Sequence, residues 1–174
     1  MEKNTLLLGS AQVKASDAVT LDIEEKHAPD VLHDLNNIPW PFKENHFQKI
    51  VCGHILEHLC SIDSAMRELY RICDSEGTVL IEVPHHTSWS ANTPDHHLRF
   101  NYFGLDKYFR SDPPAADISE EPCFRVISRE ITFHRSFRRV LLHKIFNMFP
   151  EDYERFWCYT FPAEHIKFEL QPIK

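Results

Sequence analysis

The stretch GHILEHL, residues 53–59, holds the side chains whose types and spacing most directly indicate chemistry. His54 and His58 are four residues apart, and Glu57 between them completes the pattern H-x-x-E-H. On a helix both imidazoles would face one side and could hold a metal ion, with the glutamate as base. The pattern therefore allows a zinc hydrolase that uses His54, Glu57 and His58.

The residues around this motif count against a metal site. FQKIVCG (47–53) is an apolar run, so His54 directly follows a predicted strand, whereas a zinc-protease motif needs one continuous helix. A third metal ligand is also required. Four downstream histidines could converge on the motif: His85, His86, His96 and His97. Because the sequence singles out none of them, we expect no metal ion.

Short apolar runs predict the elements that must position the motif. Strands are predicted over residues 5–9, 18–23, 30–35, 47–53 and 78–83. Apolar residues at helical spacing predict an amphipathic helix over 62–73, and Gly77 indicates a turn before the last of these strands. Strands that alternate with a helix indicate a parallel sheet buried on both faces.

The second half of the chain has a different pattern. It predicts a long loop with a short helix near 104–109, a strand over 123–135, a helix over 136–149, an aromatic segment over 153–161 and a strand over 165–173. The last strand alternates apolar and polar residues through Ile166, Phe168 and Leu170, so one of its faces should be buried. We therefore expect a seven-stranded, mostly parallel sheet that ends in an antiparallel pair, 123–135 and 165–173.

Composition sets the broad class. The chain has 174 residues, 43% hydrophobic and 26% charged, which is typical of one globular domain over residues 1–174. Its five cysteines show no C-x-x-C spacing, which favours reduced thiols in the cytoplasm. The net charge of -7 opposes nucleic-acid binding. Basic and aromatic residues nevertheless gather in 125–149, where a membrane surface or a protein partner could bind.

The run DLNNIPWPFKENHFQKIVCGHILEHLCSIDSAMRELYRICDSEGTVLIEVP, residues 34–84, resembles a known family. It is similar to the central block of class I S-adenosylmethionine-dependent methyltransferases of the methyltransferase-11 type. In that family an acidic residue and an "lPfpdnsfD" turn precede the fourth strand. The motif H-x-L-E-H follows, and then a helix, a glycine turn and a strand that ends in Val-Pro. A weaker resemblance continues through HLRF (97–100) and FPAEHIKFELQPIK (161–174).

The resemblance implies a fold and an activity. The fold is an α/β, Rossmann-like, mostly parallel sheet with an antiparallel C-terminal strand. A helical and aromatic insert, 136–162, precedes that last strand within a single methyltransferase-like domain. The implied reaction transfers a methyl group from S-adenosylmethionine to a small-molecule acceptor, and the resembling family points to a sugar or lipid-linked envelope intermediate.

The resemblance also assigns the cofactor site. In such sheets ligands bind beyond the carboxyl ends of the parallel strands. Gly9 would start the turn beneath the methionine part, and Asp22 would accept hydrogen bonds from the ribose hydroxyls. The other implied cofactor contacts are Ser10 in the glycine turn, Asp34 and Leu35 at the adenine, and Gly53 and His54 beside the reacting methyl group.

One departure from the family concerns the glycine turn. The family usually has G-x-G, whereas this chain reads Gly9-Ser10-Ala11. Only residues 10–17 separate the first two predicted strands, and a parallel helical crossover normally needs about a dozen. The first crossover helix should therefore be short or missing. The alternative to an active enzyme is thus a catalytically silent, methyltransferase-like binding module, and cofactor titration distinguishes the two.

Methyl transfer also requires a group that removes a proton from the acceptor. A histidine suits this role when the acceptor is a hydroxyl. His58 and His97 lead the candidates because they match family positions, ahead of His85 and His86. The loop 85–117 and the insert 136–162 are expected to form the acceptor site.

Overall fold

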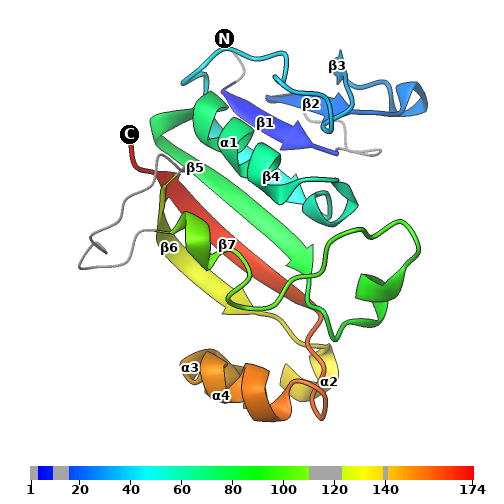
Figure 1. The fold of residues 1–174 in the computed structure, drawn as a ribbon, viewed down its shortest axis with the longest axis vertical. Coiled ribbons are helices and arrows are strands. Elements are labelled where there is room, and N and C mark those ends of the chain that lie inside the picture. The colour runs from blue at the N-terminus through cyan, green and yellow to red at the C-terminus, as the bar shows by residue number, and fades with distance from the viewer. Residues whose placement is uncertain (1–3, 10–15, 110–122, 139–140) are drawn as a thin grey trace.

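The computed structural model describes residues 4–9, 16–109, 123–138 and 141–174. Seven strands of these residues form one sheet in the order β3-β2-β1-β4-β5-β7-β6 (Figure 1). They are β1 (Thr5–Leu8), β2 (Ala18–Asp22), β3 (Val31–Leu32), β4 (Phe47–Gly53), β5 (Cys73–Pro84), β6 (Phe124–Ile131) and β7 (His165–Pro172).

The direction of the strands confirms the predicted fold class. Strands β1 to β5 pair in parallel, whereas β7 is antiparallel to both β5 and β6. On β7, Ile166, Phe168 and Leu170 are all buried, as their alternation predicted. The chain therefore has an α/β, Rossmann-like sheet that ends in an antiparallel pair.

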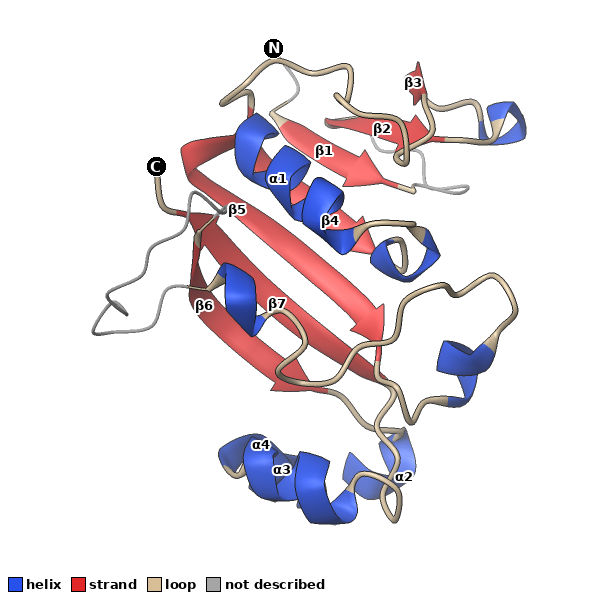
Figure 2. Ribbon diagram, viewed as in Figure 1, coloured by secondary structure: helices blue, strands red, loops and turns tan. Residues whose placement is uncertain are grey.

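Helix α1 (Ile62–Ile72) lies on one face of the sheet (Figure 2). It begins where the Ser61 hydroxyl accepts a hydrogen bond from the Ser64 N–H, and it buries Ala65, Met66 and Leu69. Strand β5 follows directly at Cys73, five residues earlier than the predicted start at 78.

Gly77 lies within β5 rather than in a separate turn before it. A Cβ atom at Gly77 would lie 2.8 Å from Cys73 Sγ and 2.9 Å from the Phe47 carbonyl oxygen. The glycine therefore allows β5 to pass close to the start of β4, where the register of the two strands shifts.

A second, smaller core lies beyond the end of the sheet. Its helices are α2 (Arg135–Arg138), α3 (Leu142–Met148), α4 (Pro150–Asp152) and the π-helical η5 (Tyr153–Trp157), seen in the lower part of Figure 1. The buried members of this core are Ile131, Phe133, Phe146, Tyr153, Cys158 and Ala163.

The prediction of one continuous helix over 136–149 is wrong. Leu141 has a left-handed backbone (φ 60°) at the start of α3, so α3 does not extend the helix α2. Within the described ranges, no helix combines the length and the apolar character needed to cross a membrane.

In the part of the chain that the structure describes, the loops between these elements contain four short 3-10 helices. They are η1 (Glu25–His27), η2 (Leu56–His58), η3 (Trp89–Asn92) and η4 (Asp106–Tyr108). The helix expected near 104–109 corresponds to η4. The helix η2 and the loop around η3 lie where β4 and β5 end, which is the edge that carries the site described next.

Candidate active site

Gly9 forms the turn at the carboxyl end of β1. Its φ is 61°, and its N–H donates to the Leu21 carbonyl oxygen of β2 at 2.9 Å. A Cβ atom at this position would lie only 1.8 Å from Ile55 Cδ1, so the turn is packed directly against the segment that follows β4. Ser10, the next predicted cofactor contact, lies outside the described residues.

Asp22 ends β2 and is buried, with its carboxylate at the edge of the sheet. Its Oδ1 accepts the Glu24 N–H at 2.9 Å, and its Oδ2 lies 3.1 Å from His27 Nδ1. These contacts fix the direction of the carboxylate.

The apolar side chains near Asp22 differ from those that the sequence indicated. Leu35, expected at the adenine, is packed in the main core, and Asp34 binds the Asn36 N–H through Oδ1 at 2.9 Å. Two exposed apolar side chains lie at the ends of β2 and β3: Ile23, which follows β2, is 62% exposed, and Leu32, the last residue of β3, is 56% exposed. Large exposed apolar side chains that gather at one edge are a common mark of a binding surface. Sequence reasoning missed Ile23, although its place after Asp22 was a usable signal.

The end of β4 leaves space for a ligand. A Cβ atom at Gly53 would meet no atom within 4 Å. The next residue, His54, has a left-handed backbone (φ 56°), and its N–H donates to the Glu82 carbonyl oxygen at 2.8 Å. The open space at Gly53, the Gly9 turn and the Asp22 carboxylate thus lie at the carboxyl ends of the parallel strands, where the resemblance predicts the cofactor.

A cavity of about 360 Å³ adjoins the same edge, and we call it the histidine cavity. Side chains that could bind or deprotonate an acceptor line it: His54, Glu57, His58, Trp89, His96 and His165. The structure thus brings the two ends of the H-x-x-E-H motif together with residues from the loop after β5 and from the start of β7.

The predicted catalytic histidines do not all lie in this cavity. His58 lines it, and its Nδ1 lies 3.1 Å from the Asp95 carbonyl oxygen. His97 is exposed and is not among the lining residues; its backbone N–H donates to the Glu57 carbonyl oxygen at 2.8 Å. Sequence reasoning did not name His165, although the resembling C-terminal segment contains it.

Two cavity histidines have unlike electrostatic surroundings. His54 Nδ1 lies 3.4 Å from Glu57 Oε1, and this interaction raises the pKa of His54 above its ordinary value. The ring of His165 meets that of His54 edge-on, with centroids 4.8 Å apart. Burial, and then the charge of His54, lower the pKa of His165. At neutral pH, a larger fraction of His165 than of His54 is therefore uncharged.

The geometry of the motif differs from that of a helical zinc protease. Only Leu56–His58 form the 3-10 helix η2, and His54 lies before it with a positive φ. The two histidines thus occupy a strand end and the following helical turn, as the apolar run before His54 indicated. This arrangement does not favour the zinc-hydrolase interpretation.

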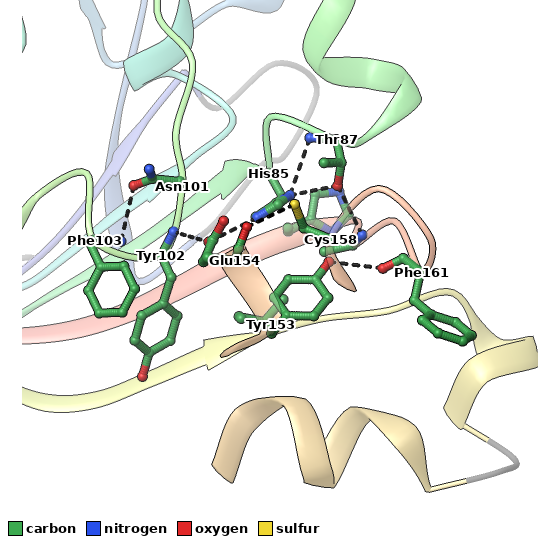
Figure 3. Close-up of polar contacts among 12 residues, drawn as sticks. His85, Thr87, Asn101, Tyr102, Phe103, Tyr153, Glu154, Cys158 and Phe161 are labelled. Carbon is green, nitrogen blue, oxygen red and sulfur yellow. Dashed lines mark hydrogen bonds and ion pairs between the residues drawn. The ribbon is translucent and has the colours of Figure 1, made fainter. Parts of the chain in front are cut away.

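His85 lies apart from the cavity, in a group that we call the Glu154 cluster: His85, Thr87 and Glu154. His85 Nδ1 lies 2.7 Å from Thr87 Oγ1, and its Nε2 lies 3.1 Å from Glu154 Oε1 (Figure 3). The Tyr102 N–H donates to the same glutamate oxygen. This cluster joins the loop after β5 to the second core through hydrogen bonds.

Comparison with known proteins agrees with this geometry. Residues 6–81 match the family described as "Methyltransferase domain". The fold resembles a SAM-dependent methyltransferase from Archaeoglobus fulgidus at 14% identity, covering 95% of this chain and 84% of that chain, with a TM-score of 0.59. No curated protein matches the chain.

Two further solved structures show the range of this fold. One is phosphoethanolamine N-methyltransferase 2 of Haemonchus contortus in complex with S-adenosyl-L-methionine, at 12% identity, covering 98% of this chain and 48% of that chain, with a TM-score of 0.55. The other is the [4+2]-cyclase SpnF, at 12% identity, covering 98% of this chain and 74% of that chain, with a TM-score of 0.59. At such identities the likeness shows the fold alone, and a cyclase among the neighbours shows that the fold does not fix the reaction. The family match over residues 6–81 confirms the resemblance that residues 34–84 indicated.

Proposed function

We propose that this chain, whose residues 6–81 match the methyltransferase domain family, transfers a methyl group from S-adenosylmethionine. The acceptor is a hydroxyl group of a small molecule bound in the histidine cavity. One observation carries the proposal. The cavity is lined by His54, the residue that follows Gly53, and Gly53 faces open space at the end of β4. An acceptor in the cavity would thus lie beside the cofactor edge.

The residues at that edge would hold the cofactor, which supplies an electrophilic methyl group when bound. Asp22 would accept the two ribose hydroxyls through charge-assisted hydrogen bonds, which are stronger than neutral ones. Ile23 would cover one face of the adenine, and the absence of a side chain at Gly53 would leave room for the methionine part. The chain's own task is alignment of the acceptor with the methyl group.

His165 is the best placed base in the cavity. Burial and the neighbouring His54 keep its imidazole in the uncharged form that can take a proton from a hydroxyl. Glu82 Oε1, 3.5 Å from His165 Nδ1, would then stabilise the imidazolium that forms. His58, the sequence candidate, faces the same cavity from the opposite side of the motif.

The lining favours a polar acceptor with several hydroxyl groups. Ser88, Ser90, Thr93 and Glu164 supply hydrogen-bonding groups around the cavity, and Trp89 offers an aromatic ring that is 85% exposed. A ring of this kind buries apolar surface against a ligand while the hydroxyls and the carboxylate bind its polar groups. A sugar, free or linked to a lipid, has this combination of surfaces.

Calorimetry with S-adenosylmethionine and S-adenosylhomocysteine tests the cofactor site. Asp22→Ala should weaken binding by about 1.5–3 kcal/mol, the range for a hydrogen bond to a charged group, or roughly 10- to 150-fold. Asp74→Ala is the matched control and should bind within about threefold of wild type, since Asp74 lies at the start of β5, away from the carboxyl edge, and accepts the Glu76 N–H of its own turn. Equal binding by the Asp22 variant would refute the site. No binding by a folded wild type would favour the silent module.

Release of S-adenosylhomocysteine over a panel of sugars and lipid-linked sugars tests the reaction. His165→Ala should lower turnover by about 100-fold or more while it leaves cofactor affinity unchanged, because a general base contributes to the rate rather than to binding. If turnover survives in this variant and falls in His58→Ala, the base is His58.

A further inference from the structure

Three groups of described histidines and carboxylates lie close enough together to share a metal ion. They are His54, Glu82 and His165; Glu57, His58 and His96; and His85, His86 and Glu154. In each group the potential ligand atoms lie within 4.8 Å of one another. The groups differ in how far the protein's own contacts already satisfy these atoms.

In two of the groups the carboxylate has partners within the protein, although Nδ1 of His86 in the group with Glu154 is buried without a hydrogen-bond partner among the described residues. In the Glu154 cluster, His85 binds Thr87 and Glu154 through its two ring nitrogens. In the group around Glu82, the ammonium of Lys167 lies 3.1 Å from Glu82 Oε2 and occupies the place that a cation would take. Neither group requires a metal ion to balance its charges.

The third group, which we call the Glu57 cluster (Glu57, His58 and His96), is different. Glu57 is 0% exposed, and apart from the ion-pair contact of His54 Nδ1 at 3.4 Å from Oε1, neither of its carboxylate oxygens has a hydrogen-bond partner among the described residues. Nδ1 of His96 is also buried and lacks such a partner. More than about 90% of buried polar groups in proteins are hydrogen-bonded, so three unsatisfied atoms in one group call for a ligand.

The hydrogen bond of His58 sets its ring for metal binding. Its Nδ1 lies 3.1 Å from the Asp95 carbonyl oxygen, which accepts a hydrogen bond from Nδ1–H, so the lone pair of the neutral ring is on Nε2. Metal-binding histidines almost always use their other nitrogen in this way, because the bond fixes both the tautomer and the ring direction. The Asp95 carboxylate, with Oδ2 at 3.4 Å from Nδ1, adds to this effect.

The backbone of Glu57 also holds the segment that carries the third ligand. The Glu57 carbonyl oxygen accepts the N–H groups of His97 at 2.8 Å and Leu98 at 3.0 Å. These bonds bring the adjacent His96 to the His58 ring, with ring centroids 4.6 Å apart. The third ligand that the sequence could not single out is therefore supplied by a loop that is tied to the motif itself.

We propose that Glu57, His58 and His96 bind one divalent transition-metal ion. Two imidazoles and a carboxylate favour Zn²⁺, which in catalytic sites takes three protein ligands and leaves a fourth position open. All three residues line the histidine cavity, so the open position would face the acceptor. Tetrahedral bonds of about 2.1 Å place ligand atoms roughly 3.4 Å apart, so small side-chain rotations complete the site.

Binding of the metal ion does not depend on the proposed function. Only the ion's contact with an acceptor oxygen rests on the proposed methyl transfer. In that case the ion would orient the acceptor hydroxyl and lower its pKa, which assists removal of its proton. The following experiment measures the ion alone. Its failure would leave methyl transfer untouched, and failure of methyl transfer would leave the metal site untouched.

The full chain is freed of metal with a chelator and titrated with Co²⁺, followed by visible absorption, and with Zn²⁺, followed by calorimetry. Wild type should bind one ion per chain with the d–d spectrum of a four-coordinate Co²⁺ site. Glu57→Gln and His96→Ala should each weaken binding by at least about 100-fold, because even an outer-shell contact of a metal site contributes 10- to 100-fold. His97→Ala is the matched control and should retain wild-type affinity, since its exposed side chain lies outside the group.

Circular dichroism of each variant establishes that it is folded, and His96→Ala decides the question if Glu57→Gln does not fold. The proposal is overturned if folded wild type binds no ion at millimolar concentration. It is also overturned if His96→Ala binds as tightly as His97→Ala.

Discussion

Glu57 and Glu154 each lie beside histidines, and the two carboxylates differ in the partners that satisfy them. Glu154 receives hydrogen bonds from His85 and from the Tyr102 backbone, so its charge is balanced within the protein. Glu57 is more deeply buried, and neither of its oxygens has a hydrogen-bond partner among the described residues. A satisfied cluster stabilises the fold, whereas an unsatisfied one keeps binding capacity for a ligand.

The largest effect expected from this comparison is on stability at the Glu154 cluster. Glu154→Ala should lower the free energy of unfolding by about 3 kcal/mol, because two donors lose their acceptor and each unsatisfied buried donor costs about 1–3 kcal/mol. Chemical denaturation followed by circular dichroism measures the change. A loss below about 0.5 kcal/mol would show that the cluster does not stabilise the second core.

Acid should weaken the same cluster. Burial alone would raise the pKa of Glu154, but hydrogen bonds from His85 and the Tyr102 N–H, with the positive potential of His85 and His86, lower it. A carboxyl whose folded pKa is depressed contributes stability that is present above its unfolded pKa, about 4.5, and is lost as the pH falls through the folded pKa.

The pH dependence can be assigned to Glu154 with one variant. Between pH 6 and pH 3, wild type should lose more stability than Glu154→Gln, which has no carboxyl to protonate at this position. Denaturation curves at several pH values provide the measurement. Parallel pH profiles for the two proteins would contradict the assignment. The neighbouring Tyr153 does not contribute between pH 6 and pH 3, because burial raises its pKa far above this range.

Several elements of the fold could be predicted from the sequence, and others could not. Strands β4, β5 and β7 and helix α1 were predictable, because each follows from a local alternation or period of apolar residues that the sheet then buries. The break before α3 was not, since the left-handed backbone at Leu141 belongs to a residue with no preference for it.

The candidate site was predictable in part for the same reason. Asp22 and Gly53 end strands, and strand ends can be found from sequence. His96 and His165 reach the cavity through a loop and an antiparallel strand that are distant in the chain from His58. Only long-range contacts bring these residues together, such as the bonds from His97 and Leu98 to the Glu57 carbonyl oxygen. No local pattern encodes such contacts.

The smallest expected effect is the most informative, and it comes from Glu57→Gln in metal-free protein. The same substitution at Glu154 removes charge-assisted hydrogen bonds and should destabilise the fold by about 1.5–3 kcal/mol. At Glu57 it removes a buried charge whose nearest charged neighbour, His54, lies 3.4 Å away and is exposed. Stability should therefore stay within about 0.5 kcal/mol of wild type or rise, because replacing a fully buried charge, whose one ion-pair partner is half exposed, by a neutral group removes a desolvation cost.

Zinc should then reverse the order of the two proteins. At a free Zn²⁺ concentration 100 times its dissociation constant, wild type gains about 2.7 kcal/mol, whereas Glu57→Gln gains little because a ligand is missing. Thermal unfolding with and without Zn²⁺ at one fixed pH measures both proteins under one condition. If metal-free Glu57→Gln loses as much stability as Glu154→Gln, both clusters serve the fold and the difference between them disappears. If it loses none and alone fails to respond to Zn²⁺, the two clusters have separate tasks: one stabilises the second core, and the other binds a ligand beside the cofactor edge.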